Sequence, residues 1–173
     1  MGKASVRENK NIYQITRENL SLTREEASDI IGGLSADKIG RIETEKTLPE
    51  AADVLLMARG YKAPHLCNYF CSCECVIGQE YVPCIEKENL PAIVLRLLSS
   101  LASVDEEKET LISITADGKI ESDELAKFVQ IQKDLEEISA TSEALRLWCQ
   151  QMIAQGNINT KEYNKLRRSQ NNG

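Results

Sequence analysis

The stretch TREEASDIIGGLSADKIGRIETEKTLP, residues 23–49, decides the fold of the first part of the chain. Thr23 is a favourable N-cap, and the glutamate three residues later completes a capping box, so a helix is expected to begin here. The Gly-Gly pair at 32–33 ends that helix in a tight turn, because glycine accepts positive φ values. Ser35 then opens a second helix, and Pro49 suits the first turn of a third.

The whole chain has the composition of a helical protein. It holds 173 residues with 9 Gly and 4 Pro, and apolar residues recur at helical spacing along most of its length. We expect an all-α chain in three parts, with no strand. These are a domain at residues 1–62, a cysteine-rich connector at 63–85 and a C-terminal helical bundle at 86–173.

The bundle is predicted to contain four or five helices with short connections. Leu90–Leu101 and Asp105–Ile114 are expected as two separate helices, followed by a turn at 116–119. Ser122 and Thr141 are expected to cap the next two helices. A last helix is expected to start near residue 160.

Charge is unevenly distributed along the chain. The protein has 21 basic and 27 acidic residues, a net charge of −6, yet residues 1–62 hold ten of each, so the acidic excess lies beyond them. No apolar run reaches the roughly 20 residues that a bilayer span requires. The first residues lack the apolar core of a secretory signal. These observations favour a cytoplasmic protein without a membrane partner.

The residue types that carry catalysis are not combined in a recognisable way. The chain has a single histidine, His65, so no arrangement of nucleophile, base and acid can be assembled around it beyond chance. A glycine-rich loop that would cradle a phosphate is also lacking. We therefore expect that the protein is not an enzyme.

The order of cap, turn, apolar spacing, glutamate and proline resembles the phage-repressor-like helix-turn-helix family of the Xre and Cro type over about residues 11–62. Two departures stand out: the turn is one residue longer than usual, and Gly40-Arg41 precedes Ile-Glu where Ser or Lys is common. The resemblance implies a five-helix lambda-repressor-like domain and a sequence-specific regulator of transcription that binds double-stranded DNA. The matching residues are Thr23, Glu25, Glu26, Ala27, Gly32, Ser35, Ile39, Ile42, Glu43 and Pro49.

In such a motif the second helix reaches base edges in the major groove with the outward residues of its N-terminal part. Arg41 is then suited to a guanine edge, and Lys38 to guanine or a phosphate. Thr23 and Arg24, at the start of the first helix, are predicted to hold a phosphate. The complete set of predicted DNA-binding residues is Thr23, Arg24, Ser35, Ala36, Asp37, Lys38 and Arg41.

The motif is compatible with two kinds of partner, DNA bound by a homodimer or another protein. DNA half-sites have two-fold symmetry, which favours a homodimer, and Leu90–Leu101 is the helix predicted to carry the subunit contact. However, Asp37 repels phosphate and a neutral domain gains little from counterion release. A helix-turn-helix that serves as an adaptor for a protein partner is therefore the alternative function.

Five of the six cysteines lie between Cys67 and Cys84. On a continuous helix the spacing of four places Cys67, Cys71 and Cys75 on one face, and with Cys84 they could bind zinc or an iron–sulfur cluster as a metal- or redox-responsive switch. No Cys-x-x-Cys pair is present. Packed thiols and a redox-sensitive disulfide remain alternatives. The sequence LCNYFC at residues 66–71, followed by CVIG at residues 75–78, is similar to that of a cysteine-rich subset of helix-turn-helix proteins from Firmicutes.

Overall fold

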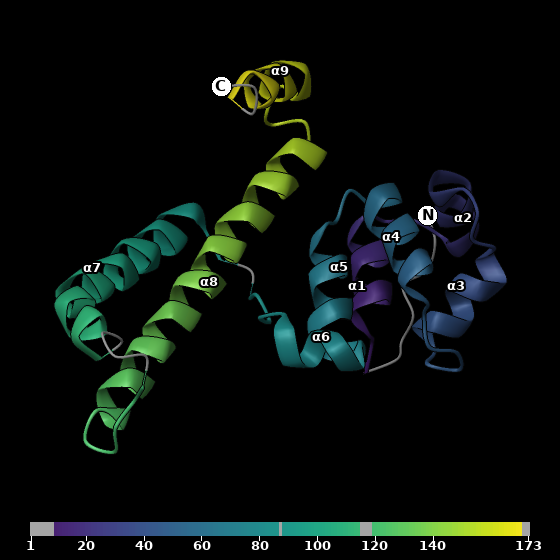
Figure 1. Ribbon diagram of the computed structural model, residues 1–173. Helices are drawn as coiled ribbons and strands as arrows, with labels where there is room; N and C mark the ends of the chain where they lie inside the picture. Colours follow the sequence, from purple (N-terminus) through teal and green to yellow (C-terminus); the bar gives the residue numbers. More distant parts are fainter. Residues whose placement is uncertain (1–8, 87, 115–118, 171–173) are drawn as a thin grey trace. The chain divides into compact units, whose positions relative to one another are not determined.

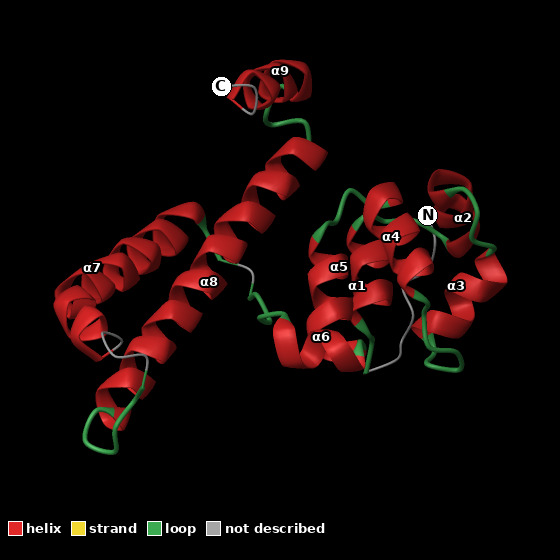
Figure 2. Ribbon diagram, in the orientation of Figure 1, coloured by secondary structure: helices red, strands yellow, loops and turns green. Residues whose placement is uncertain are grey.

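The computed structural model of the chain describes residues 9–86, 88–114 and 119–170 (Figure 1). Every regular element in these ranges is a helix, so the predicted all-α class is confirmed (Figure 2). The chain divides into two compact units, one formed by Met1–Val82 with Cys149–Gly173 and the other by Pro83–Trp148. This division differs from the boundaries predicted at residues 62 and 85.

None of the described helices combines the length and apolar character that a bilayer span requires.

Four short helices, joined by tight turns, begin the first unit: α1 (Ile12–Asn19), α2 (Arg24–Ile31), α3 (Ala36–Glu43) and α4 (Ala51–Gly60). Thr23 caps α2 in a complete capping box with Glu26, and the Ser35 side chain accepts a hydrogen bond from the backbone of Lys38. Both predicted caps are confirmed. The turn between α2 and α3 uses positive φ values of 61° and 98° at the glycine pair 32–33, which is the conformation that glycine adopts most easily.

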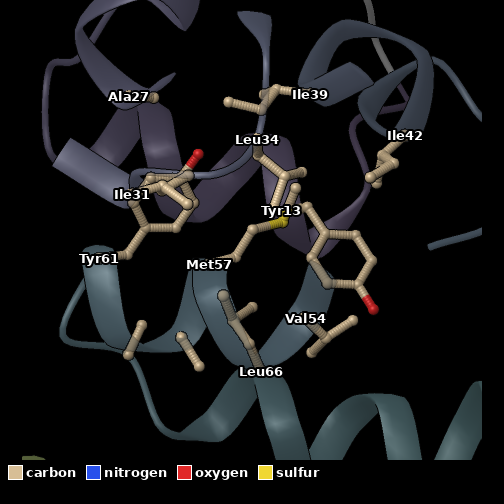
Figure 3. Close-up of a cluster of buried hydrophobic side chains, with 12 residues drawn as sticks. Tyr13, Ala27, Ile31, Leu34, Ile39, Ile42, Val54, Met57, Tyr61 and Leu66 are labelled. Atoms are coloured by element: carbon tan, nitrogen blue, oxygen red, sulfur yellow. The ribbon is translucent and has the colours of Figure 1, made fainter. Parts of the chain in front are cut away.

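A continuous hydrophobic core lies between α1, α2, α3 and α4, as Figure 3 shows for Tyr13, Val54, Met57 and Leu66. Leu66 is fully buried in it and belongs to α5 (His65–Tyr69), the helix that follows α4. The core therefore extends beyond residue 62, the predicted end of the domain, because residues of the predicted connector fill part of it. Its buried members are Tyr13, Ala27, Ile31, Leu34, Ile39, Ile42, Val54, Met57, Ala58, Tyr61, Ala63 and Leu66.

Beside this apolar core lies a buried ionic cluster centred on Glu43. The Glu43 side chain is 0% exposed, and its two carboxylate oxygens accept bonds from Arg17 Nε (2.5 Å) and Arg17 Nη2 (2.9 Å). Arg24 Nε, at the start of α2, donates to Glu43 Oε2 over 2.8 Å. The carboxylate beside it raises the pKa of Arg17. One carboxylate thus joins α1, α2 and α3.

The second unit contains α7 (Leu90–Ile114) and most of α8 (Leu125–Ala154). The two helices predicted at 90–101 and 105–114 form this single α7, so that prediction is wrong. The prediction that Thr141 caps a helix is also wrong, because its hydroxyl donates to Glu137 O (2.8 Å) and lets α8 continue. α8 begins at Leu125, three residues after Ser122, which the sequence predicts as the cap of this helix. The turn predicted at 116–119 falls largely outside the described residues.

We expect the replacement Glu43→Ala to destabilise the first unit by about 3–5 kcal/mol. It leaves the buried Arg17 guanidinium without its counter-charge, and breaking a buried pair typically has this cost. The free energy of unfolding, measured by chemical denaturation, tests this. Asp29→Ala, at an exposed position on α2, is the matched control and should change stability by less than about 0.5 kcal/mol. Equal losses in the two variants would contradict the assigned role of Glu43.

Candidate nucleic-acid interface

α3 has two chemically different faces. Ile39, Ile42 and Glu43 are buried at 0–1% exposure and fix the helix against its neighbours. Asp37 and Arg41, one turn apart, are exposed on the opposite face, with Ala36 partly exposed beside them. Ser35 is exposed, and its hydroxyl is engaged in the cap of the helix. The fold therefore gives α3 an outward surface made of one cation, one anion and small side chains.

Arg41 is oriented by a single neighbour. Its Nε donates to Thr47 Oγ1 over 3.1 Å, in the loop that follows α3. No hydrogen bond within the described part of the chain engages its two terminal nitrogens. The guanidinium is thus held at one nitrogen while the two that form bidentate contacts stay available to a ligand.

Lys38 is placed differently from the sequence-based expectation. Its Nζ forms an ion pair with Asp53 Oδ1 over 2.7 Å, across the gap between α3 and α4. Asp53 is 5% exposed, and its second oxygen accepts the backbone N–H of Glu50 over 3.0 Å. The hydrogen bond that Lys38 donates to Asp53 raises the pKa of Lys38. Lys38 therefore ties α3 to the start of α4, and sequence spacing gave no sign of this pairing.

The predicted phosphate site at the start of α2 is occupied by the protein itself. The Thr23 hydroxyl accepts the backbone N–H of Glu26 (3.1 Å), and the Thr23 N–H donates to Glu26 Oε2 (2.7 Å). The hydrogen bond from the Thr23 N–H lowers the pKa of the Glu26 carboxyl. A phosphate approaching Thr23 would meet this carboxylate, which makes the helix start a poor anion site.

Arg24 explains why glycine stands at position 40. Its side chain crosses α3 at Gly40 to reach Glu43, so a Cβ at position 40 would lie 3.3 Å from Arg24 Nη1. Glycine at this position leaves room for the arginine. Arg24, predicted to hold a phosphate, is therefore oriented by Glu43, and its side chain is 38% exposed.

The cysteine-rich connector predicted at residues 63–85, called the cysteine segment below, does not form one continuous α-helix. After α5 the chain widens into the π-helix η1 (Phe70–Glu74), and Cys75 is extended (φ −83°, ψ 118°) before α6 (Val76–Tyr81) begins. α6 folds back so closely that a Cβ at Gly78 would lie 1.9 Å from the Cys71 carbonyl oxygen. The prediction that three thiols share one helical face is therefore wrong, because η1 changes the helical repeat and the extended residue breaks it.

The thiols do not fit a metal site in this arrangement. No group of three or more His, Cys, Asp or Glu side chains in the described residues is placed to hold a metal ion. Of the predicted ligands, Cys67, Cys71 and Cys75 belong to the first unit, in α5, in η1 and at the residue between η1 and α6, whereas Cys84 belongs to the second unit. All six cysteines of the chain, which lie in the described ranges, are thiols without a disulfide. Cys67 packs against the hydrophobic core.

Polar contacts attach the cysteine segment to α1. The Tyr13 hydroxyl donates to Glu74 Oε2 (2.8 Å), and the rings of Tyr13 and Tyr69 meet edge to face at 6.1 Å. Thr16 Oγ1 and His65 Nε2 lie 3.5 Å apart. Burial raises the pKa of Tyr13 well above its usual range, and the bond to Glu74 adds to the shift. These contacts join residues up to 61 positions apart, so no local pattern could have indicated them.

Comparisons with known proteins add no constraint. No family model matches the chain, and neither the curated proteins nor the solved structures give a match.

We expect Cys67 to react with iodoacetamide more slowly than Cys84 in the native protein at neutral pH. Burial raises the pKa of the Cys67 thiol and lowers its thiolate fraction, whereas Cys84 is exposed. Time-resolved alkylation followed by mass spectrometry of the peptides measures both rates. In urea-unfolded protein the two rates should converge. If Cys67 reacts as fast as Cys84 before unfolding, its partial burial against the core is refuted.

Proposed function

We propose that α1–α5 form a helix-turn-helix domain of the phage-repressor-like type and that the protein is a sequence-specific DNA-binding regulator of transcription, with no enzymatic activity. α2, the glycine turn and α3 would form the motif. The supporting observation is α3 itself, which is capped at Ser35, anchored by three buried side chains and exposed along the face that carries Asp37 and Arg41. Such a regulator would act in the cytoplasm.

The outward residues of α3 are chemically suited to base edges. The two terminal nitrogens of Arg41 match the O6 and N7 acceptors of guanine, the commonest specific contact in the major groove. Asp37 can accept from the amino group of cytosine, and the Ala36 methyl can contact thymine. Asp37 would repel a phosphate, so its place on this face favours contact with bases over contact with the backbone.

The neighbouring cations have a different role in this proposal. Arg24 and Lys38 neutralise Glu43 and Asp53 and so set the angle at which α3 is presented. A phosphate contact by Lys38 would have to share or break the ion pair with Asp53. Arg41 is therefore the residue of α3 on which specificity depends most.

We expect Arg41→Ala to weaken binding to a duplex selected from genomic fragments by about tenfold to a hundredfold, since a bidentate guanine contact contributes about 1–3 kcal/mol of discrimination. Lys38→Ala should weaken it less. Fluorescence anisotropy with the selected duplex, and with the same duplex changed at single guanines, measures affinity and specificity.

Arg59→Ala, an exposed arginine on α4, is the control of matched charge. It should leave discrimination between the two duplexes unchanged. A wild-type protein that selects no fragment, or an Arg41→Ala variant that discriminates as well as the wild type, would reject the proposal.

A homodimer is the second part of the proposal. Three leucines of α7 are exposed to solvent. Leu95 is 72% exposed, Leu98 is 58% exposed and Leu101 is 47% exposed. They recur at helical spacing on one helix, and contiguous apolar surface of this kind often marks a subunit contact. Two copies joined here would suit a DNA site with two-fold symmetry.

We expect the double variant Leu95→Glu/Leu98→Glu to be monomeric at concentrations where the wild type is a dimer, because two buried charges per subunit would oppose association. Sedimentation equilibrium measures the mass. Ile112→Glu/Leu125→Glu, which adds the same charge at two exposed apolar positions of the same unit, should stay dimeric. A monomeric wild type would exclude the dimer.

A protein-interaction adaptor is the alternative function, and α6 supplies the observation in its favour. Its outer side chains Val76, Ile77 and Tyr81 are 79%, 72% and 82% exposed. Gly78 holds the helix against the Cys71 backbone, which leaves these side chains outside. Recovery of a stoichiometric protein partner that is lost in Ile77→Ser/Tyr81→Ser, together with an absence of DNA binding, would favour the adaptor.

A further inference from the structure

Beyond residue 62, basic charge is concentrated in one element. Residues 63–159 contain 7 basic and 16 acidic residues, whereas α9 (Thr160–Gln170) contains four basic residues and one acidic residue, Glu162. α9 is the last helix within the described residues (Figure 1). The strongest local excess of positive charge therefore lies far along the sequence from the helix-turn-helix motif.

The cations of α9 are exposed and have no acidic partner in the part of the chain that the structure describes. This differs from α1, α2 and α3, where Arg17, Arg24 and Lys38 are engaged by buried carboxylates. Lys161, Lys165 and Arg168 are spaced by four and three residues, so they lie along one face of the helix. Arg167 is next to that face.

Two anionic surfaces fit a basic helix: a nucleic-acid backbone and an anionic membrane. A helix that lies in a membrane interface needs a broad apolar face with several large side chains. α9 provides Tyr163 and Leu166, and polar residues occupy its other positions. Three cations in a row along one face instead match the line of charges that a duplex backbone presents.

We propose that α9 is a second DNA-contacting element that binds the phosphate backbone without reading sequence. Its Lys161, Lys165 and Arg168 side chains pair with phosphates of a duplex and release counterions. They supply electrostatic affinity that the neutral domain at residues 1–62 lacks, since Arg17, Arg24 and Lys38 are held there in internal ion pairs. This inference rests on the proposed function for the identity of its partner, duplex DNA.

The test uses the full chain and a mixed-sequence duplex. Binding is measured by fluorescence anisotropy across a series of salt concentrations for the wild type, for Lys161→Ala/Lys165→Ala/Arg168→Ala, and for the charge-matched control Lys108→Ala/Lys127→Ala/Lys133→Ala. Each phosphate contact contributes about 0.9 to the slope of log affinity against log salt. The α9 variant should therefore lose about 2–3 from this slope, and the control should keep the wild-type slope. Circular dichroism verifies that both variants stay helical.

Equal slopes in the two variants would overturn the inference, as would a wild type that does not bind the mixed-sequence duplex at low salt. Binding of the wild type to phosphatidylserine vesicles that depends on α9, without the slope change on DNA, would overturn it in favour of a membrane. A slope that depends on α9 in a protein that selects no particular sequence would support the inference. That last result would at the same time reject the sequence-specific regulator.

Discussion

The buried carboxylate of Glu43 is the constraint on which the first unit depends. It comes from the last residue of α3 and is satisfied by Arg17 from α1 and Arg24 from α2, so it fixes three short helices at one point. An eight-residue helix is too short to be stable in isolation and depends on its tertiary contacts. A charged group without exposure to water has to be paired, so α3 can rotate or slide little without leaving Glu43 or Arg17 unsatisfied.

This constraint also determines which charges remain for a ligand. The first 62 residues hold equal numbers of acids and bases, yet these charges are not equivalent. Arg17, Arg24 and Lys38 neutralise Glu43 and Asp53 inside the fold, whereas Arg41 extends from α3 with only its Nε engaged within the described residues. A neutral total therefore conceals a division between the structural cations Arg17, Arg24 and Lys38 and the exposed cations, of which Arg41 is the one on α3. The proposed contribution of α9 follows from the same division.

The cysteine segment contributes to the fold in a way that its composition does not indicate. Leu66 fills the core, Cys67 packs against it, and Glu74 accepts a hydrogen bond from Tyr13. Residues 63–82 of the segment are thus a part of the first unit that packs on α1 and α4. Cys67 lies in α5, Cys71 and Cys73 lie in η1, Cys75 is the extended residue between η1 and α6, and Cys84 follows α6. This distribution suits packing better than the shared coordination of an ion.

The sequence by itself determined the features whose partners lie within one turn. Thr23 and Ser35 cap helices with groups three residues away, the glycine pair turns the chain, and apolar spacing marked Ile39 and Ile42 as buried. Within the second unit the sequence overestimated the number of breaks, since a serine or threonine that resembles a cap, such as Thr141, can also satisfy its hydroxyl inside a helix. Only the tertiary structure decided the partners of Arg24, Lys38 and Tyr13, which lie 19, 15 and 61 residues away. Local spacing cannot encode such pairs, because they form only when packing of the core brings distant helices together.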